Sequence, residues 1–206
     1  MDADPVELRV LGSLIEKQRT TPDVYPLSLN ALRLACNQST NRDPVVEYDE
    51  PAIRAALQQL SDRRWVRLAS GPGSRAAKYR HLLDEALGVG AEELSVLAVL
   101  MLRGPQTPGE LKQRTERLHP FDPEKLEATL SALAERRLAA QLERRPGQKE
   151  QRYVQLLGGE TQDAVVPQPA ASDPLAALAA RVDALEASVR AVKRAVDEIS
   201  HSRHGV

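Results

Sequence analysis

Apolar residues recur every three or four positions in three successive segments near the start of the chain, and this spacing predicts three amphipathic helices. Each segment follows a residue that can cap a helix N-terminus, namely Asp4, Ser28 and Asp49. Two short runs rich in β-forming residues, 65–68 and 78–82, lie on either side of a Gly/Pro turn and predict a β-hairpin. The apolar positions that we expect to face the core of this part are Leu8, Leu11, Leu14, Ile15, Leu29, Leu32, Leu34, Ala35, Ile53, Ala56, Leu57 and Leu60.

The same order of elements occurs a second time further along the chain. A helix is expected from Ala91, two more follow the caps Thr107 and Asp122, and the runs 138–144 and 152–154 predict a second hairpin. The two copies match residue by residue at the end of the third helix and in the hairpin: Leu57, Leu60, Arg63, Arg64, Lys78 and Tyr79 correspond to Leu130, Leu133, Arg136, Arg137, Arg152 and Tyr153.

Three helices followed by a hairpin are the arrangement of a winged helix, a helix-turn-helix variant whose third helix can enter the major groove of DNA. The sequence therefore predicts a mainly α protein with small β-hairpins, an α+β fold built from two tandem winged-helix domains at residues 4–84 and 91–157. Residues 158–172 are rich in Gly, Pro and small residues and predict a flexible linker. Residues 173–201 alternate apolar spacings of three and four, which predicts a C-terminal coiled-coil helix.

The seam of this coiled coil bears on the oligomeric state. Valine recurs at one seam position and mostly Leu or Ile at the other, which favours a two-stranded parallel assembly, so we expect a homodimer. A helix that folds back on the domains of its own chain is the alternative, because the seam covers only about four heptads. The residues expected to mediate oligomerisation are Leu178, Val182, Leu185, Val189, Val192 and Val196.

The composition is that of a globular protein: 206 residues, 42% hydrophobic and 28% charged. The single cysteine, Cys36, excludes an intramolecular disulfide, and we expect it to be a small core residue. The sequence shows neither a signal peptide nor an apolar run long enough to span a membrane, so we expect a cytoplasmic location and no membrane contact. The net charge of −1 gives no general attraction to nucleic acid, so any such role must rest on local patches.

Residue patterns typical of catalysis or of cofactor binding are sparse. The four histidines are scattered, and one cysteine cannot supply a thiolate metal site. Neither a GxxxxGK[ST] loop nor a GxGxxG turn occurs. We therefore expect a protein that is not an enzyme, with no catalytic residue, no cofactor and no metal site.

The strongest candidate for a functional surface is the basic segment between Arg63 and His81, which holds six cationic residues and no acidic one. Such charge at the end of the third helix and along the hairpin favours contact with DNA phosphates, although a solvated charged hairpin is the alternative. In the second copy, Glu143 and Glu150 only partly offset the basic residues of the hairpin. The third helix of that copy, however, directs Glu124, Glu127 and Glu135 outward, where they would repel phosphates, so we expect that copy to contact protein instead. The residues that we expect to bind nucleic acid are Arg54, Gln58, Arg63, Arg64, Arg67, Arg75, Lys78 and Arg80.

A polar loop around residues 37–48 is an insertion that the second copy lacks. It is rich in side chains that donate and accept hydrogen bonds, so Asn37, Asn41 and Arg42 are candidates for a contact loop. The commoner role of such residues is to form turns and caps, and this alternative stays open.

The residues around this loop resemble a known signature. The stretches 26–32 (PLSLNAL), 35–38 (ACNQ) and 41–45 (NRDPV) are similar to the motif of the bacterial YceH family of uncharacterised proteins. The resemblance extends over residues 5–157 and implies the tandem winged-helix fold and, by analogy, a regulatory DNA-binding role. It implies no catalytic residues, because the family has no assigned activity and a fold alone does not define function.

Three functional hypotheses follow from the sequence. The leading one is a dimeric, non-enzymatic transcriptional regulator that binds double-stranded DNA through its first domain. The alternative is a protein–protein interaction scaffold that does not bind nucleic acid directly and meets its partner through the second domain. A weaker third hypothesis is a ligand sensor that uses the Asn-rich loop.

Overall fold

The computed structural model describes residues 3–69, 77–143, 150–159 and 164–165 of the chain. Residues 1–166 form one compact unit, and the following account concerns this unit. The predicted coiled-coil helix at 173–201, with its oligomerisation residues, lies outside the described residues, as do the tips of both predicted hairpins.

In the first half of the unit, the described residues 3–69 and 77–82 form three α-helices and three short strands. Its helices begin where the sequence predicts, because the side chains of Asp4, Ser28 and Asp49 each accept a hydrogen bond from the backbone N–H three residues further on. The strands form one antiparallel sheet in the order β1-β3-β2. The elements are α1 (Pro5–Thr20), the short 3-10 helix η1 (Pro22–Val24), β1 (Leu27–Ser28), α2 (Leu29–Cys36), α3 (Glu50–Asp62), β2 (Val66–Leu68) and β3 (Lys78–His81).

The second half, residues 83–165, repeats the order of three helices and a hairpin but differs in three respects. A short helix precedes it, its third strand follows the hairpin, and an isolated bridge between Gln106 and Tyr153 takes the place of the first strand. Thr107 and Asp122 cap their helices as predicted. The three strands form a second antiparallel sheet in the order β5-β4-β6, and β6 lies within the stretch predicted to be a linker. The elements are α4 (Leu83–Leu87), α5 (Ala91–Arg103), α6 (Pro108–Thr115), α7 (Pro123–Glu135), β4 (Ala139–Leu142), β5 (Tyr153–Gln155) and β6 (Ala164–Val165). The predicted mainly helical α+β class is confirmed.

The backbone of the two halves is alike in detail where the sequence repeats. Each third helix ends in an arginine with a left-handed backbone, Arg64 with φ of 60° and Arg137 with φ of 55°. In each half the next residue donates a backbone hydrogen bond back into the helix, from Trp65 to Leu60 over 2.8 Å and from Leu138 to Leu133 over 2.9 Å. This is the helix C-terminal cap in which the left-handed position is usually glycine.

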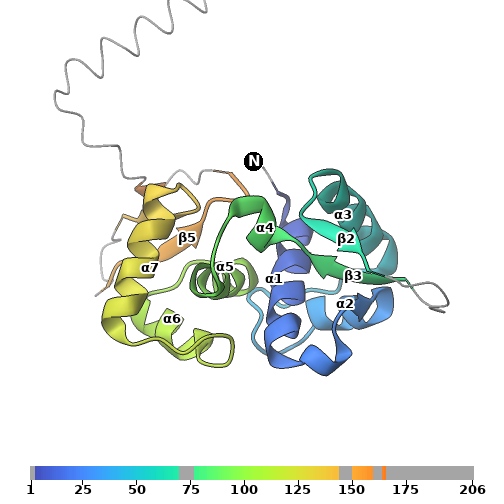
Figure 1. The fold of residues 1–206 in the computed structure, drawn as a ribbon, viewed down its shortest axis with the longest axis horizontal. Helices are drawn as coiled ribbons and strands as arrows, with labels where there is room; N and C mark the ends of the chain where they lie inside the picture. Colours follow the sequence, from blue (N-terminus) through green and yellow to red (C-terminus); the bar gives the residue numbers. More distant parts are fainter. Residues whose placement is uncertain (1–2, 70–76, 144–149, 160–163, 166–206) are drawn as a thin grey trace, which may run out of the picture. The chain divides into compact units, whose positions relative to one another are not determined.

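Two central helices, α1 and α5, pack against each other and join the halves (Figure 1). Residues 10–15 of α1 and residues 94–102 of α5 are buried without interruption. A helix that is buried on all sides needs neighbours around its whole circumference, and here each half covers the central helix of the other. Residues from both halves consequently belong to a single hydrophobic cluster.

The end of the second half also contacts the beginning of the first. The backbone N–H of Ala3 donates to the carbonyl of Leu157 over 2.9 Å. At Gly158, a side chain would come within 3.0 Å of Leu8 and 3.1 Å of the Ala3 carbonyl oxygen, so the lack of a side chain there allows the two segments to approach.

One predicted core position is wrong. Leu34 is 57% exposed, whereas Leu32 and Cys36 on the same helix are fully buried. Residues two apart on an α-helix point to different faces, so Leu34 cannot share the inward face with Leu32 and Cys36. The prediction that Cys36 is a small core residue is confirmed, and burial raises the pKa of its thiol to about 11.

His81 is a buried polar residue that connects β3 to the core. Its Nε2 atom lies 2.7 Å from Oε1 of Gln18, and its backbone N–H donates to the hydroxyl of Tyr25 over 2.9 Å. Burial lowers the pKa of His81 to about 4, although the neighbouring Asp84 carboxylate acts in the opposite direction. The imidazole is therefore neutral at pH 7.

None of the helices that the structure describes is both long and apolar enough to cross a lipid bilayer.

The contact between α1 and α5 predicts a stability effect at Gly12. A Cβ atom at this position would lie 2.8 Å from Cγ of Leu102 and 3.3 Å from Cβ of Met101, closer than packed carbon atoms tolerate. We expect Gly12→Ala to lower the free energy of unfolding by about 1–2 kcal/mol, because the overpacking outweighs the gain in helix propensity. Urea denaturation followed by circular dichroism measures the change.

Gly109→Ala is the matched control, since a Cβ atom at this exposed helical glycine has only the Thr107 hydroxyl, 4.0 Å away, near it. This variant should keep or raise the free energy of unfolding by up to about 1 kcal/mol. Equal effects of the two substitutions would contradict the close packing of α1 on α5.

A second prediction concerns pH. In the unfolded chain His81 takes up a proton near pH 6.5, but in the folded chain only near pH 4. The unfolded state therefore binds the proton first, and the free energy of unfolding falls as the pH drops from about 6.5 to about 4. Between pH 7 and pH 4.5 we expect the wild type to lose about 2 kcal/mol more than His81→Gln does. Identical losses in urea titrations of both proteins would contradict this assignment.

Candidate functional site

The outward face of the β2–β3 ladder is cationic. Arg67 on β2 lies directly opposite Arg80 on β3, and Lys78, two residues before Arg80, lies on the same face. The opposite face carries the facing pair Val66 and His81, which are both buried. Arg67 and Lys78 are exposed. Successive side chains of the hairpin point to opposite faces of the ladder, so one face packs against the core and the other is basic.

Arg80 has one acidic partner near the surface. Its Nη2 atom lies 3.3 Å from Oε1 of Glu85, whose side chain is 65% exposed. The Arg80 side chain itself is 29% exposed, and an ion pair at the surface of this kind contributes little energy and is screened by salt. Like charges that face each other across a ladder are destabilising, and the Arg67–Arg80 pair is such an arrangement.

The two arginines at the end of α3 differ in their surroundings. Arg63 forms an ion pair with the buried carboxylate of Glu7 over 3.2 Å, and its guanidinium lies 5.7 Å from the ring centre of Trp65. This side chain thereby fixes the end of α3 to the start of α1. Arg64 is exposed and precedes β2.

The outer face of α3 carries the other two predicted residues that the structure describes. Arg54 pairs with Glu50 over 2.6 Å, and the amide of Gln58 donates to Asp62 over 2.8 Å. Both pairs are exposed bonds within one helix, so they can exchange for other partners at little cost. Arg75 lies outside the described residues.

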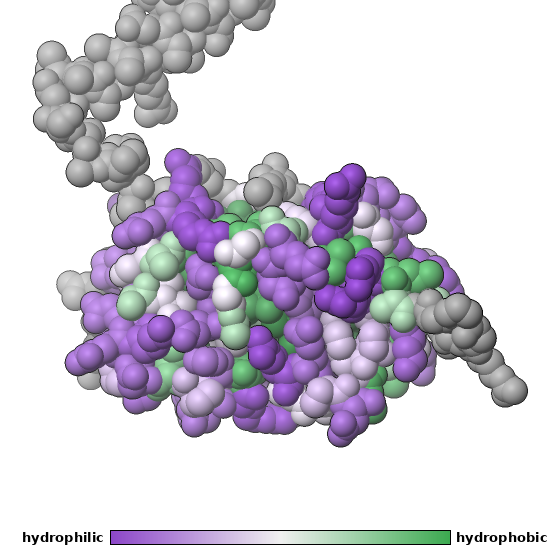
Figure 2. All heavy atoms as spheres, viewed as in Figure 1, coloured by the Kyte–Doolittle hydropathy of each residue, from purple (hydrophilic) through white to green (hydrophobic). Residues whose placement is uncertain are grey.

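The corresponding arginines of the second half are bound within the chain. Arg136 donates to the backbone carbonyls of Leu87 and Gly88 and pairs with Glu93 over 2.9 Å. Arg152 pairs with Glu110 over 3.0 Å. Figure 2 shows that hydrophilic residues form most of the face of the unit seen there.

The facing residues of the β4–β5 ladder are uncharged: Ala139 with Gln155, Ala140 with Val154, and Gln141 with Tyr153. On α7 the exposed residues include Glu124, Glu127 and Glu135, as the sequence predicts. A hollow of about 530 Å³ lies between α6 and α7, and its lining includes Pro108, Pro123, Leu126, Leu130 and Tyr153. The β4–β5 ladder and α7 therefore present a neutral to acidic surface beside an apolar depression.

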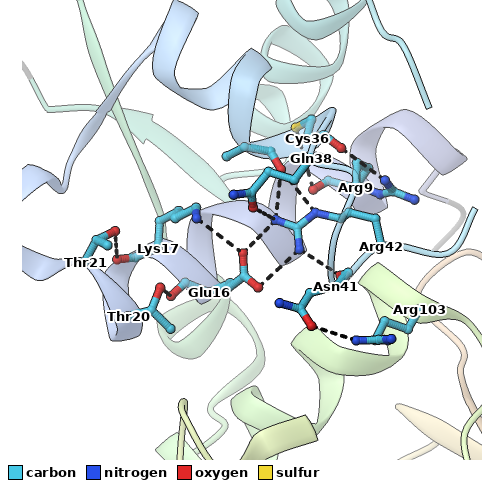
Figure 3. A network of polar contacts seen from close by, with 11 residues as sticks. Arg9, Glu16, Lys17, Thr20, Thr21, Cys36, Gln38, Asn41, Arg42 and Arg103 are labelled. Atoms are coloured by element: carbon cyan, nitrogen blue, oxygen red, sulfur yellow. Dashed lines mark hydrogen bonds and ion pairs between the residues drawn. The ribbon is translucent and has the colours of Figure 1, made fainter. Parts of the chain in front are cut away.

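The predicted contact loop is bonded to the body of the unit (Figure 3). The Asn37 side chain exchanges two hydrogen bonds with the backbone of Tyr48, over 2.8 and 2.9 Å. Arg42 is 5% exposed and donates to both carboxylate oxygens of Glu16, over 3.1 and 2.6 Å, as well as to the carbonyl of Ala35. Asn41 accepts a hydrogen bond from Arg103 of α5 over 2.9 Å.

Two further contacts tie the same loop to the central helices, and one involves a residue that the sequence did not single out. Arg9 of α1 is buried and donates to the carbonyl of Pro44 over 2.7 Å and to that of Cys36 over 3.1 Å. The backbone N–H of Asp43 donates to the carbonyl of Leu102 over 2.9 Å. The signal for Arg9 was its position within the apolar run of the first helix, where a charged residue needs internal acceptors.

Across the described ranges, no group of three or more His, Cys, Asp and Glu side chains lies close enough together to hold a metal ion.

Comparisons with known proteins place the chain in a family. Residues 3–148 match the family model DUF480, whose description is a protein of unknown function. A UPF0502 protein from Geotalea daltonii is 53% identical over 167 residues, which are 80% of this chain and 76% of the relative. Another from Solibacter usitatus is 47% identical over 196 residues, 95% of each chain.

A UPF0502 protein from Pseudomonas aeruginosa is 47% identical over 180 residues, 87% of this chain and 80% of the relative. These names state no activity. The expectation of an uncharacterised bacterial family is confirmed, and the chain belongs to the DUF480 family, whose curated relatives are named UPF0502 proteins.

Proposed function

We propose that this protein is a non-enzymatic regulator that binds double-stranded DNA through its first half. The observation that carries the proposal is the cationic outer face of the β2–β3 ladder, formed by Arg67, Lys78 and Arg80. The facing pair Arg67 and Arg80 costs stability in the isolated protein. The phosphates of a DNA duplex supply the missing negative charge, and release of counterions from the duplex adds to the affinity.

The order of elements in the first half supports this proposal. α1, β1, α2, α3, β2 and β3 occur in the sequence of a winged helix, with β3 in the middle of the sheet. In such a fold α3 would approach the bases and the β2–β3 hairpin the backbone. Arg54 and Gln58 lie on the outer face of α3, where they could contact a groove once their pairs within the helix exchange.

The two halves have a similar backbone but a different surface charge. This difference supports assigning DNA binding to the first half alone. Arg136 and Arg152 are bound to Glu93 and Glu110, and the exposed face of α7 is rich in glutamate. Negative side chains in this position would repel phosphates.

A dimer is part of the proposal. Two copies paired through the C-terminal seam, which lies outside the described residues, would present two first halves to neighbouring half-sites of a duplex. Analytical ultracentrifugation of Leu185→Glu tests this part, since a charge in the seam should convert the dimer to a monomer.

Charge-removing substitutions test DNA binding. We expect Arg67→Gln and Arg64→Gln each to weaken binding to a labelled mixed-sequence duplex, and to reduce the slope of log K against log salt by about 1, because each substitution removes a phosphate contact. Fluorescence anisotropy over a salt titration measures both quantities.

Arg137→Gln is the matched control, because Arg137 occupies the equivalent left-handed position of the second half. It should bind DNA as the wild type does. Absence of binding by the wild type at low salt, or an equal loss in Arg64→Gln and Arg137→Gln, would overturn the proposal.

A second candidate function, a protein–protein scaffold, is favoured by the apolar hollow between α6 and α7. Exposed apolar depressions of this kind bind partner side chains. Affinity purification with and without nuclease distinguishes the two functions: a partner that is retained after nuclease treatment and lost in Lys112→Glu, a change at an exposed residue of the hollow, favours the scaffold, whereas partners lost with the nucleic acid favour the DNA-binding regulator.

A further inference from the structure

A basic pocket of about 350 Å³ lies where the two halves of the unit meet. Its walls come from α1, from the loop at 37–48, from the end of α5 and from α6 with the turn that follows it. Polar and charged side chains dominate the lining, among them Glu16, Asn41, Arg103, Gln113, Arg114 and Arg117. Because these residues come from four separate segments, no local sequence pattern predicts the pocket.

The charges of this pocket are unbalanced. Three arginines, Arg103, Arg114 and Arg117, line it together with one carboxylate, Glu16. Both oxygens of Glu16 already accept hydrogen bonds from the buried Arg42, as Figure 3 shows. The negative charge of Glu16 is therefore already compensated by Arg42, and the positive charge of the three arginines that line the pocket is in excess.

A second carboxylate near the pocket is shared as well. Glu110 lies 3.5 Å from Arg114, but it also pairs with Arg152 over 3.0 Å and caps the start of α6 through the backbone of Thr107. One carboxylate cannot balance two guanidinium groups and a helix N-terminus. Arg114 thus keeps most of its capacity to bind an anion.

Arg103 is held in a fixed position at the edge of the pocket. Its Nη1 atom donates to Asn41 over 2.9 Å, and its buried Nε atom has no hydrogen-bond partner among the described residues. Burial and, after it, the neighbouring guanidinium of Arg114 lower the pKa of Arg103. Arg103 therefore contributes a fixed guanidinium group to the wall of the pocket.

We propose that this pocket binds a small molecule that carries a phosphate group. Three guanidinium groups provide the paired N–H donors that recognise phosphate oxygens, and the amides of Asn41 and Gln113 can bind polar groups of the remaining molecule. The volume is within the range of small-ligand pockets. A concave site of this size suits a compact ligand better than the backbone of a duplex.

A ligand bound in this pocket would contact both halves of the unit and would stabilise the junction between them. The lining joins α1 and the loop of the first half to α5 and α6 of the second. A ligand that binds only the folded state raises the temperature of unfolding.

Inorganic phosphate is the probe for the test. The full chain is titrated with phosphate at constant ionic strength, with chloride as the replaced anion, and followed by calorimetry and by thermal unfolding. We expect saturable binding and a rise in the unfolding temperature. Arg117→Gln should weaken phosphate binding about tenfold or more, since it removes one charged donor from an exposed position.

Arg33→Gln on α2, which removes the same charge outside the pocket, should bind phosphate as the wild type does. Arg103→Gln should abolish binding. If that variant folds poorly because the bond to Asn41 is lost, Arg114→Gln and Arg117→Gln still decide the question. No saturable binding by the wild type, or equal affinity in Arg117→Gln and Arg33→Gln, would refute the site.

A short DNA duplex serves as competitor. We expect it to leave phosphate binding in the pocket unchanged at a salt concentration that permits DNA binding. If the duplex displaces phosphate and Arg117→Gln loses DNA affinity to the same extent, the pocket belongs to a nucleic-acid surface, and the proposal of a small ligand is wrong.

Discussion

The packing of α1 on α5 is the constraint on which the rest of this structure depends. The middle of each helix, residues 10–15 of α1 and 94–102 of α5, is buried on every side, and Gly12 allows the close approach of the two helices by leaving room for Leu102. A helical segment that is buried around its whole circumference needs neighbours on all sides, so neither half has a complete core without the other. The inserted loop reinforces this pair, because Arg9 of α1 donates to the carbonyl of Pro44, Arg42 of the loop donates to Glu16 of α1, and Asp43 bonds to the end of α5.

On this common frame the two halves carry different side-chain chemistry. The same backbone position holds Arg63 in one half and Arg136 in the other, and both anchor their third helix to the body of the unit. The surfaces beyond these anchors diverge into a cationic ladder on one side and a glutamate-rich helix with an apolar hollow on the other. A repeated fold thus supports two surfaces with separate roles, since function depends on the site and not on the fold.

Local features could be predicted from the sequence, whereas contacts across the chain could not. Helix starts at Asp4, Ser28 and Asp49 were predictable because a cap and its partner lie three residues apart. The basic face of the hairpin followed partly from the spacing of two between Lys78 and Arg80. The bonds from Arg42 to Glu16 and from Arg103 to Asn41 span 26 and 62 residues, so they depend on tertiary packing, and the second depends on how the two halves meet.

The backbone bond between Ala3 and Leu157 brings the start of the first repeat next to the end of the second hairpin. A short peptide could therefore join these ends while new termini are opened elsewhere, because the entropy of closing so small a gap is modest. Circular permutation at an exposed connection such as Gly88 would convert the order of the repeats from first–second to second–first and keep the core unchanged. In the folded unit the start of the first repeat and the end of the second are thus neighbours, so the order of the repeats along the chain is not fixed by their packing.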